Sequence, residues 1–194
     1  MPAHLGARPV GRFLSLEDFC TCTRTYRLFR DAIAPYPEAP ESFVALDDLT
    51  RELLDPVVEA FGRDRFELTF GFCSRDLQRH LVRRNPETGA RYGRVDPHVD
   101  QHMAFERRPN GSLYCSKPGA ACDFRIRRLD SRELVDRVLD LELPFDSLYY
   151  YGPDRPIHLS HGPEHRRAIW TFGSQGTPTR KGIEGWVERA RAMR

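Results

Sequence analysis

The segment 43–61 constrains the fold most, because its apolar residues recur with the period of an α-helix. The stripe consists of Leu46, Leu49, Leu53, Leu54, Val57, Val58 and Phe61. A helix with one apolar face must bury that face against another element of structure. The chain has 194 residues, enough to build a sizeable core for this helix to pack on.

Short strands and further helices follow this helix along the chain. Alternating apolar residues predict a strand at 66–72, and Ser74 is placed to cap a helix at 74–84. Further strands are predicted at 102–105, 122–127, 147–151 and 157–159, and further helices at 131–141 and 182–194. The apolar segment 168–172 fits either a strand or a helix.

This order of elements indicates the fold class. Helices and short strands are mixed without the regular strand-helix-strand alternation of a parallel sheet, which favours an α+β protein. We expect a small central, mainly antiparallel sheet flanked by helices. No repeat, low-complexity tract or linker marks a boundary, so we expect a single domain over residues 1–194.

Charge and hydropathy exclude several classes of partner. Lys and Arg number 30 against 28 Asp and Glu, and the formal charge of +2 is too small for a nucleic-acid-binding surface. No apolar run approaches the roughly 20 residues of a transmembrane helix, and residues 1–12 show no stretch of signal-peptide length. We therefore expect a cytoplasmic protein that binds neither membranes nor nucleic acids.

The chain has five cysteines, an odd number: Cys20, Cys22, Cys73, Cys115 and Cys122. Without a secretion signal, reduced thiols are expected and a disulfide framework is not. Their spacing does not match a cysteine zinc site, because Cys20 and Cys22 are too close in sequence and no second close pair follows.

Histidines and carboxylates concentrate in two segments. The first contains His98, Asp100, His102 and Asp123, and the second contains His158, His161 and His165. Imidazole and carboxylate groups from separate strands can hold a divalent metal and leave a coordination position open for water. The two segments therefore predict a metal site. Either His158 or His161 could serve as its last ligand, and Asp123 could instead pair with a nearby arginine such as Arg125.

Three short motifs carry a resemblance to a known group of enzymes. The segments 100–102 (DQH), 119–123 (GAACD) and 157–160 (IHLS) resemble the Ser-x-His, Gly-x-Ala-x-Asp and apolar-His-x-Ser/Asp signatures of zinc D-alanyl-D-alanine carboxypeptidases and phage endolysin metallopeptidases. This superfamily shares the hedgehog-type fold. Similar flanking phrases, such as 45–61 and 144–148, extend the resemblance over most of the chain, as for a divergent member.

The resemblance implies a zinc ion on the sheet, bound by His102, Asp123 and His158. It also implies a glutamate shortly before the last histidine, which activates water, but that position falls within 149–151, a run of tyrosines. The nearest carboxylate before His158 is Asp154, so Asp154 and Tyr151 are the candidate catalytic residues. A tyrosine hydroxyl with a pKa of about 10 is a poor base unless a cation lowers that pKa.

Substrate contacts also depart from the family pattern. The family's Ser-Gly-Tyr-Arg-Ser turn, whose arginine contacts substrate, is replaced by FGFCS at 70–74, and Arg75 stands two positions late. Ser74 and Arg75 are therefore candidate substrate-binding residues, together with Arg166 in an Arg- and His-rich segment that could clamp an anion. An insertion at 103–118, between His102 and Asp123, is expected to reshape the pocket.

These features predict a zinc-dependent hydrolase that acts on an amide or related bond of a small-molecule or peptide-like substrate, which can be anionic. One alternative is an iron(II) and 2-oxoglutarate oxygenase, whose facial triad would be His98, Asp100 and His158, with Arg166 or Arg167 holding 2-oxoglutarate. Another is a non-catalytic zinc-binding module, as hedgehog-type relatives of the scaffold suggest, because the glutamate is missing.

Overall fold

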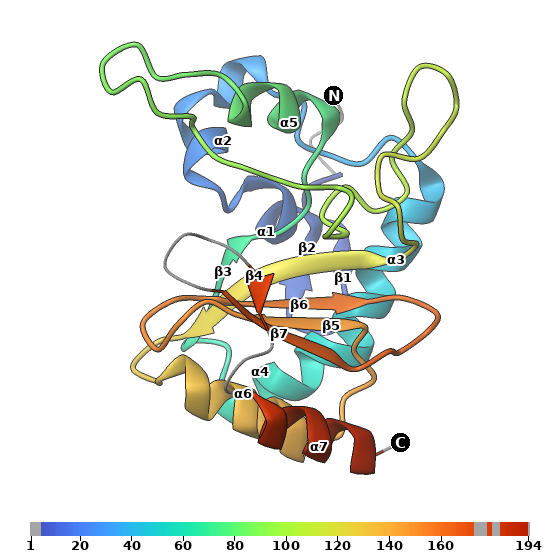
Figure 1. Cartoon of the computed structure of the whole chain (residues 1–194). Coiled ribbons are helices and arrows are strands. Elements are labelled where there is room, and N and C mark those ends of the chain that lie inside the picture. Colours follow the sequence, from blue (N-terminus) through green and yellow to red (C-terminus); the bar gives the residue numbers. More distant parts are fainter. Residues whose placement is uncertain (1–4, 173–177, 180–182, 194) are drawn as a thin grey trace.

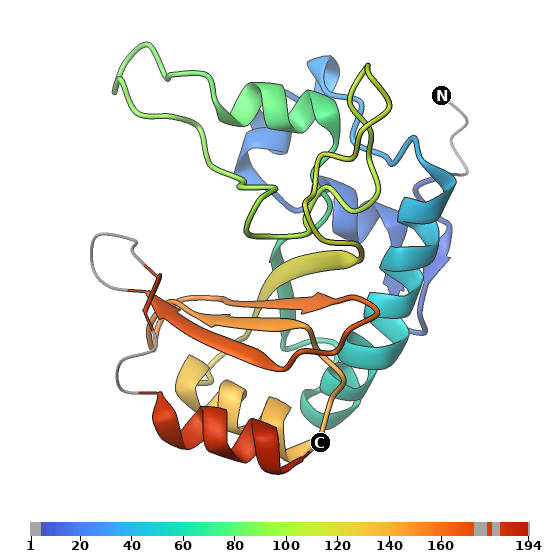
Figure 2. The same ribbon diagram turned by 45° about the vertical axis from the view of Figure 1, so that its right-hand side comes forward.

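The computed structural model describes residues 5–172, 178–179 and 183–193, and its elements form layers around a central sheet (Figure 1). Helices α6 (Ser131–Asp140) and α7 (Glu184–Ala192) lie side by side on one face of the sheet, as Figure 2 also shows. Toward the other face lie α2 (Arg24–Leu28) and α5 (Arg75–Leu81). A short 3-10 turn (Arg30–Ala32) follows α2.

Among the described residues, six strands form the sheet in the order β3-β4-β6-β5-β7-β8. Their bounds are Phe66–Phe70 (β3), Ala120–Ile126 (β4), Ser147–Tyr150 (β5), Ile157–His161 (β6), Ala168–Phe172 (β7) and Pro178–Thr179 (β8). Neighbouring strands are antiparallel except β5 and β7, which run parallel. The expected α+β class and mainly antiparallel sheet are confirmed, and the sheet is larger than predicted.

The N-terminal part forms a small unit beside the sheet. Strands β1 (Pro9–Val10) and β2 (Leu14–Ser15) pair as a hairpin, and α1 (Leu16–Thr21) follows directly and contacts β3. Ser15 caps α1 through a reciprocal pair of bonds with Asp18, which satisfies two backbone donors that the first turn leaves without partners.

The predicted helix at 43–61 is present and begins three residues earlier. It consists of α3 (Pro40–Leu49), a π-helical turn (Thr50–Leu54) and α4 (Asp55–Phe61). Pro56 has no N–H and its ring crowds the carbonyl one turn earlier, and the wider π turn accommodates both effects. The stripe is buried against the sheet: its fully covered members are Leu46, Leu49, Leu53, Leu54, Val57 and Val58.

One face of the sheet is apolar. In β4, Cys122, Phe124 and Ile126 alternate into the main core, so Asp123 between them faces the opposite side. Side chains of the helices α3, α4 and α6 pack in the same core. The opposite face of the central strands is therefore the one available for polar side chains.

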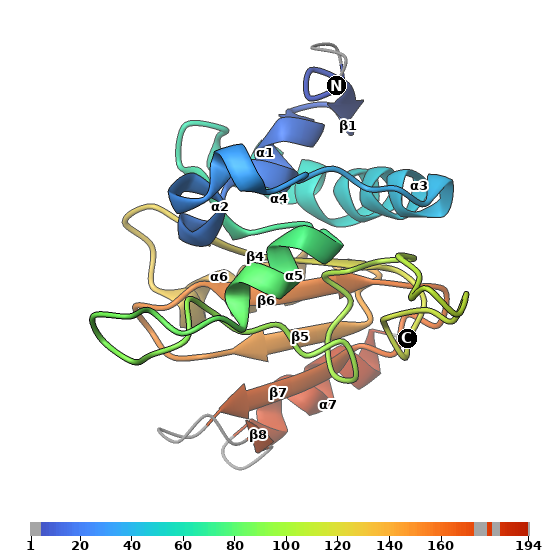
Figure 3. The ribbon, with the colours of Figure 1, turned by 90° about the horizontal axis from the view of Figure 1, so that it is seen from above.

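A long excursion of the chain, residues 82–119, covers that opposite face. It contains turns and two isolated bridges, and its Met103 and Cys115 pack with Leu77 and Leu81 of α5 in a second core cluster. Seen from above, α5 and the excursion lie over the central strands of the sheet (Figure 3). The space between the sheet and the excursion contains the candidate site.

For two segments, the predicted type of secondary structure needs correction or completion. The strand predicted at 102–105 is wrong: these residues form a turn, because Ala104 has a φ of 45° and its N–H donates to the Gln101 carbonyl. The segment 168–172 is a strand, β7. The terminal helix is confirmed as α7, anchored by buried Trp186, while Gly182 and Arg194 at the ends of the predicted range lie outside the described residues.

In the described part of the chain, no helix has both the length and the apolar character needed to cross a bilayer. The five cysteines are all unpaired, and burial raises the pKa of the Cys115 thiol to about 12.

The helical stripe can be tested by a matched pair of substitutions. Leu53→Ala removes a side chain that is fully buried, and should lower the free energy of unfolding by about 2–5 kcal/mol through lost burial and the cavity left behind. Val44→Ala, at a side chain that is 60% exposed on the same helix, should change it by less than about 0.5 kcal/mol. Urea unfolding followed by circular dichroism measures both, and equal losses would contradict the packing.

Candidate metal centre

Two of the three predicted ligands are brought together by strand register. Asp123 of β4 and His158 of β6 are direct partners in the antiparallel ladder, so their side chains lie next to each other on the same face. His102 reaches the same place from the excursion. The nitrogen and oxygen atoms that these three residues offer all lie within 4.8 Å of one another.

Asp123 stands between the two imidazoles. Its Oδ1 lies 2.8 Å from Nδ1 of His158 and 3.4 Å from Nε2 of His102. The two histidine rings are 4.9 Å apart between centroids and nearly perpendicular, at 78°. Both histidines are buried, whereas the Asp123 side chain is 20% exposed, so the group is open on the carboxylate side.

The position of the His102 ring is fixed by hydrogen bonds to its surroundings. Its Nδ1 lies 2.9 Å from the Gly71 carbonyl oxygen, which can only accept, so Nδ1 carries a proton and donates. When the ring is neutral, its Nε2 therefore has the lone pair directed at Asp123. Metal-binding histidines commonly use such a carbonyl bond to fix the ring and its tautomer.

His158 is held by stacking. The ring of Tyr149, its partner on β5, lies parallel to it at 4.4 Å and 13°, and the Tyr149 hydroxyl donates to the Val99 carbonyl at 2.7 Å. Tyr149 therefore joins the sheet to the excursion across the site. Nε2 of His158 is a buried polar atom that has no hydrogen-bond partner among the described residues, which is unusual in a folded protein and typical of a functional position.

The charges of the group favour a cation. Burial lowers the pKa of His102, but the Asp123 carboxylate outweighs burial and raises it to about 9. Burial likewise raises the pKa of Asp123, but the two histidines outweigh burial and hold it well below its usual range. An ionised carboxylate between two imidazoles, in a setting with little water, needs positive charge beside it, which either a protonated His102 or a metal ion that replaces its proton can supply. Two imidazoles and one carboxylate are a common ligand set for zinc and also for iron(II), so the residues fit such an ion.

The group forms part of the wall of a pocket of about 510 Å³. The other residues that line it are Phe70, Arg94, Val95, Asp96, Val99, Asp100, Tyr149, Tyr151, Arg155, Phe172 and Pro178. They come from β3, from the excursion, from β5 and the loop after it, and from β7 and β8. A pocket of this size is suited to a small molecule.

Of the two candidate catalytic residues, the structure brings one to the pocket. Tyr151 lines it. Asp154 is exposed at the tip of the β5–β6 loop and lines a separate hollow between that loop and the connection from β4 to α6. A backbone hydrogen bond from the Arg155 N–H to the Gly152 carbonyl closes the turn that contains Asp154.

The three candidate substrate-binding residues lie outside the pocket lining. Ser74 is the N-cap of α5, and its hydroxyl accepts from the Leu77 N–H at 3.1 Å. Arg75 forms an ion pair with Glu38, and Arg166 forms one with Glu164. Each of the three therefore has a structural partner, and of these only the helix cap at Ser74 was predicted from the sequence.

The structure also distinguishes between alternative ligands. His161 is three positions after His158 on the same strand, so it faces the other side of the sheet, where its ring lies 5.1 Å from that of His165. His98 is exposed, and its Nδ1 lies 2.9 Å from the Ser116 hydroxyl. Asp100 lines the pocket but accepts backbone bonds from His102 and Asp96. His98 and Asp100 therefore do not join His158 in the close group.

The sequence did not reveal Arg155 and Phe172 as residues of the site, and within the tyrosine run 149–151 it singled out Tyr151 and not Tyr149. Tyr149 could have been found from strand alternation, since it lies two residues before Tyr151 and faces the same side. Arg155 and Phe172 come from a loop and a neighbouring strand whose position depends on the pairing of β5 with β7.

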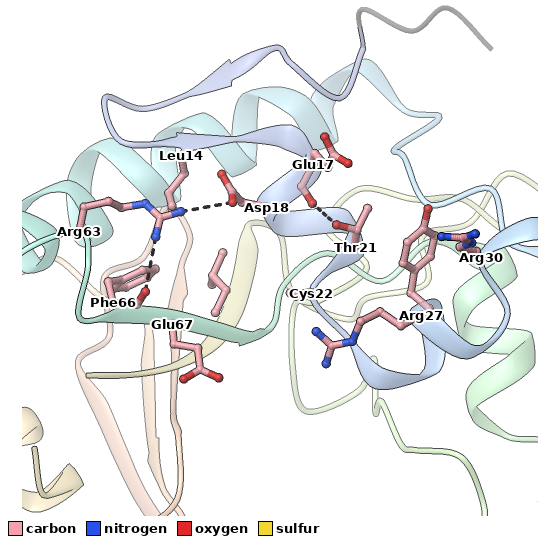
Figure 4. Close-up of a pocket in the computed structure, with 12 residues that line it drawn as sticks. Leu14, Glu17, Asp18, Thr21, Cys22, Arg27, Arg30, Arg63, Phe66 and Glu67 are labelled. Atoms are coloured by element: carbon pink, nitrogen blue, oxygen red, sulfur yellow. Dashed lines mark hydrogen bonds and ion pairs between the residues drawn. The ribbon is translucent and has the colours of Figure 1, made fainter. Parts of the chain in front are cut away.

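A second hollow, of about 700 Å³, lies between α1, α2 and the edge strand β3 (Figure 4). In it Arg63 is bonded to Asp18 at 3.3 Å and directed toward the Phe66 carbonyl, and the remaining side chains mix both charges. The residues described for this hollow include no member of the His102, Asp123 and His158 group. We therefore regard the smaller pocket as the candidate site.

Comparisons with protein-family models, with curated proteins and with solved structures give no match to this chain.

The bond from Tyr149 to the excursion can be tested without any ligand. Tyr149→Phe keeps the ring on His158 but removes the hydroxyl that bonds Val99, so the free energy of unfolding should fall by about 0.5–1.5 kcal/mol. Amide hydrogen exchange in 96–100 should become faster, while exchange in α6 stays unchanged. Unchanged exchange in 96–100 would contradict the proposed link between the sheet and the excursion.

Proposed function

We propose that this chain is a zinc-dependent hydrolase that acts on an amide or related bond of a small-molecule or peptide-like substrate, as the D-alanyl-D-alanine metallopeptidases do. The observation that carries the proposal is the convergence of His102, Asp123 and His158 on the wall of a pocket of small-molecule size. The order of the three motifs along the chain supports the same assignment.

Zinc bound to such ligands lowers the pKa of a bound water to about 7 and polarises a carbonyl group. The chain's own residues then have separate tasks. The Gly71 carbonyl orients His102, and the Tyr149 ring orients His158, so the ligand atoms keep their directions when the pocket fills.

Tyr151 is suited to donate a hydrogen bond. Burial raises the pKa of its hydroxyl well above the usual value, and the nearby Asp123 carboxylate acts in the same direction. The hydroxyl therefore keeps its proton at neutral pH and does not serve as a base. It can instead stabilise negative charge that develops on a substrate oxygen, as the donors of an oxyanion hole do.

The excursion offers carboxylates that could accept a proton. Besides Asp123, the carboxylates that line the pocket are Asp96 and Asp100. Asp100 uses both oxygens to accept backbone N–H groups of Asp96 and His102. Asp96 bonds the backbone of His98 through one oxygen, while the other faces the exposed side chain of Arg94 at 3.2 Å. Both carboxylates are therefore engaged, and Asp96 differs in that its second partner, Arg94, is an exposed side chain, so we propose Asp96 as the acceptor of a proton from water.

A non-catalytic zinc-binding module is the second candidate. One observation favours it: the loop that leads into His158 contributes Tyr151 and Arg155 to the pocket, and Asp154 lines a different hollow. A protein that had lost its water-activating carboxylate would retain the metal ligands and the pocket but not the hydrolysis.

Metal content of the purified chain tests the first step of the proposal. We expect about one zinc ion per chain, and we expect Asp123→Ala to lose it because the substitution removes the ligand between the two imidazoles. His98→Gln is the matched control: it should keep the zinc, since His98 lies outside the close group. Bound iron with 2-oxoglutarate turnover that His98→Gln abolishes would contradict the proposal and support the oxygenase.

Hydrolysis separates the two zinc-dependent candidates. Over a panel of dipeptides and acyl amino acids, Tyr151→Phe should lower kcat by roughly 10²–10³-fold with little change in KM, because the lost donor acts mainly on the transition state. Zinc-loaded protein that hydrolyses none of these compounds would favour the non-catalytic module. Equal kcat for the Tyr151→Phe variant would refute the role given to this hydroxyl.

A further inference from the structure

We infer that the pocket beside the metal group binds a compound that carries an aromatic ring next to a carboxylate. The inference rests on the proposed function only in treating this pocket as the substrate site. Two observations support it independently: one wall of the pocket is built from aromatic rings, and one of its cations has no carboxylate partner in the part of the chain that the structure describes.

The aromatic wall comes from two adjacent strands. Tyr149 lies on β5, Tyr151 follows two residues later, and Phe172 ends the neighbouring strand β7. The Phe172 ring centroid is 5.3 Å from that of Tyr149 and 4.9 Å from that of Tyr151. The rings of Tyr151 and Phe172 are half-buried. A flat apolar group placed on these rings would remove their exposed faces from water and stack favourably.

The metal group lies directly beside this wall. In register across the sheet, Phe70 is paired with Asp123, Asp123 with His158, and His158 with Tyr149. Phe70 lines the pocket on the far side of the group, where its ring centroid is 4.6 Å from that of His102. An aromatic ligand held by the wall is therefore adjacent to the ligand atoms of the proposed zinc ion.

Among the pocket residues that the structure describes, one cation is left available. Asp123 is engaged with two histidines, and Asp96 faces Arg94. Arg155 also lines the pocket, and within the described residues no carboxylate lies within ion-pair distance of its guanidinium. A guanidinium binds a carboxylate through two parallel hydrogen bonds. Arg155 is thus the residue that would hold an anionic group on the ligand.

The test uses zinc-loaded protein and three small probes. The first is 3-phenylpropionate; the second is butyrate, which keeps the charge without the ring; the third is 3-phenylpropionamide, which keeps the ring without the charge. Isothermal titration calorimetry should give an affinity for 3-phenylpropionate at least about 10-fold above each of the other two probes. Butyrate loses the stacking contact and 3-phenylpropionamide loses the ion pair, and the loss of either contact should lower the affinity by about that factor.

Two variants assign the preferences to residues. Arg155→Gln should remove most of the preference for the acid over the amide, and Phe172→Leu should reduce the preference for phenylpropionate over butyrate by about 3- to 10-fold. Arg83→Gln, at an exposed arginine outside the pocket lining, is the control and should leave all three affinities unchanged. The same titrations with zinc removed show whether the acid binds Arg155 or only the metal.

The outcomes separate this inference from the proposed function. Zinc-loaded protein that shows equal affinities, or an acid preference that survives Arg155→Gln, overturns the inference and leaves the zinc proposal standing. A chain that binds no zinc refutes the proposed function, and the ring and charge preferences in that metal-free chain still decide the inference.

Discussion

The pairing of Asp123 with His158 across β4 and β6 is the interaction on which the rest of the site depends. The two strands run antiparallel in the middle of the sheet, and their register sets an ionised carboxylate against an imidazole at 2.8 Å. Because side chains alternate along a strand, a shift of one residue would send one of the two into the apolar core. The buried Cys122 and Phe124 on either side of Asp123 oppose such a shift, so the core that stabilises the fold also fixes the site.

The third ligand is positioned by a close approach of two chain segments. The Gly71 carbonyl accepts from His102, and a side chain at Gly71 would come within 2.3 Å of the Phe19 carbonyl oxygen. Only glycine allows α1, the end of β3 and the excursion to meet there. The excursion then returns over the sheet, and the Tyr149 hydroxyl holds it at Val99. The pocket is therefore formed by long-range contacts between a rigid sheet and an irregular loop.

Strong periodic patterns made much of the fold predictable from the sequence. The leucine stripe that identified the long helix is buried against the sheet, and the three proposed ligands, taken from motif order, lie together. Residues outside such patterns were harder to place. The predicted strand at 102–105 is a turn because Ala104 adopts a positive φ. Asp154 lies in a proline-rich turn, and Arg75 has an acidic partner far away in sequence. The direction of such side chains depends on tertiary contacts that the local sequence does not encode.

The chemistry of the pocket is divided among three groups of residues. The first is the proposed ligands, two on the sheet and one in the excursion. The second is the aromatic wall on β5 and β7, and the third is the polar residues of the excursion and the β5–β6 loop. We propose that His102, Asp123 and His158 bind one divalent ion together. X-ray absorption at the zinc edge of the loaded protein tests this claim most directly. The predicted result is nitrogen and oxygen ligands at about 2.0–2.2 Å, including the multiple-scattering signature of two imidazoles. A first shell that contains sulfur at about 2.3 Å, or only one imidazole, would contradict the claim.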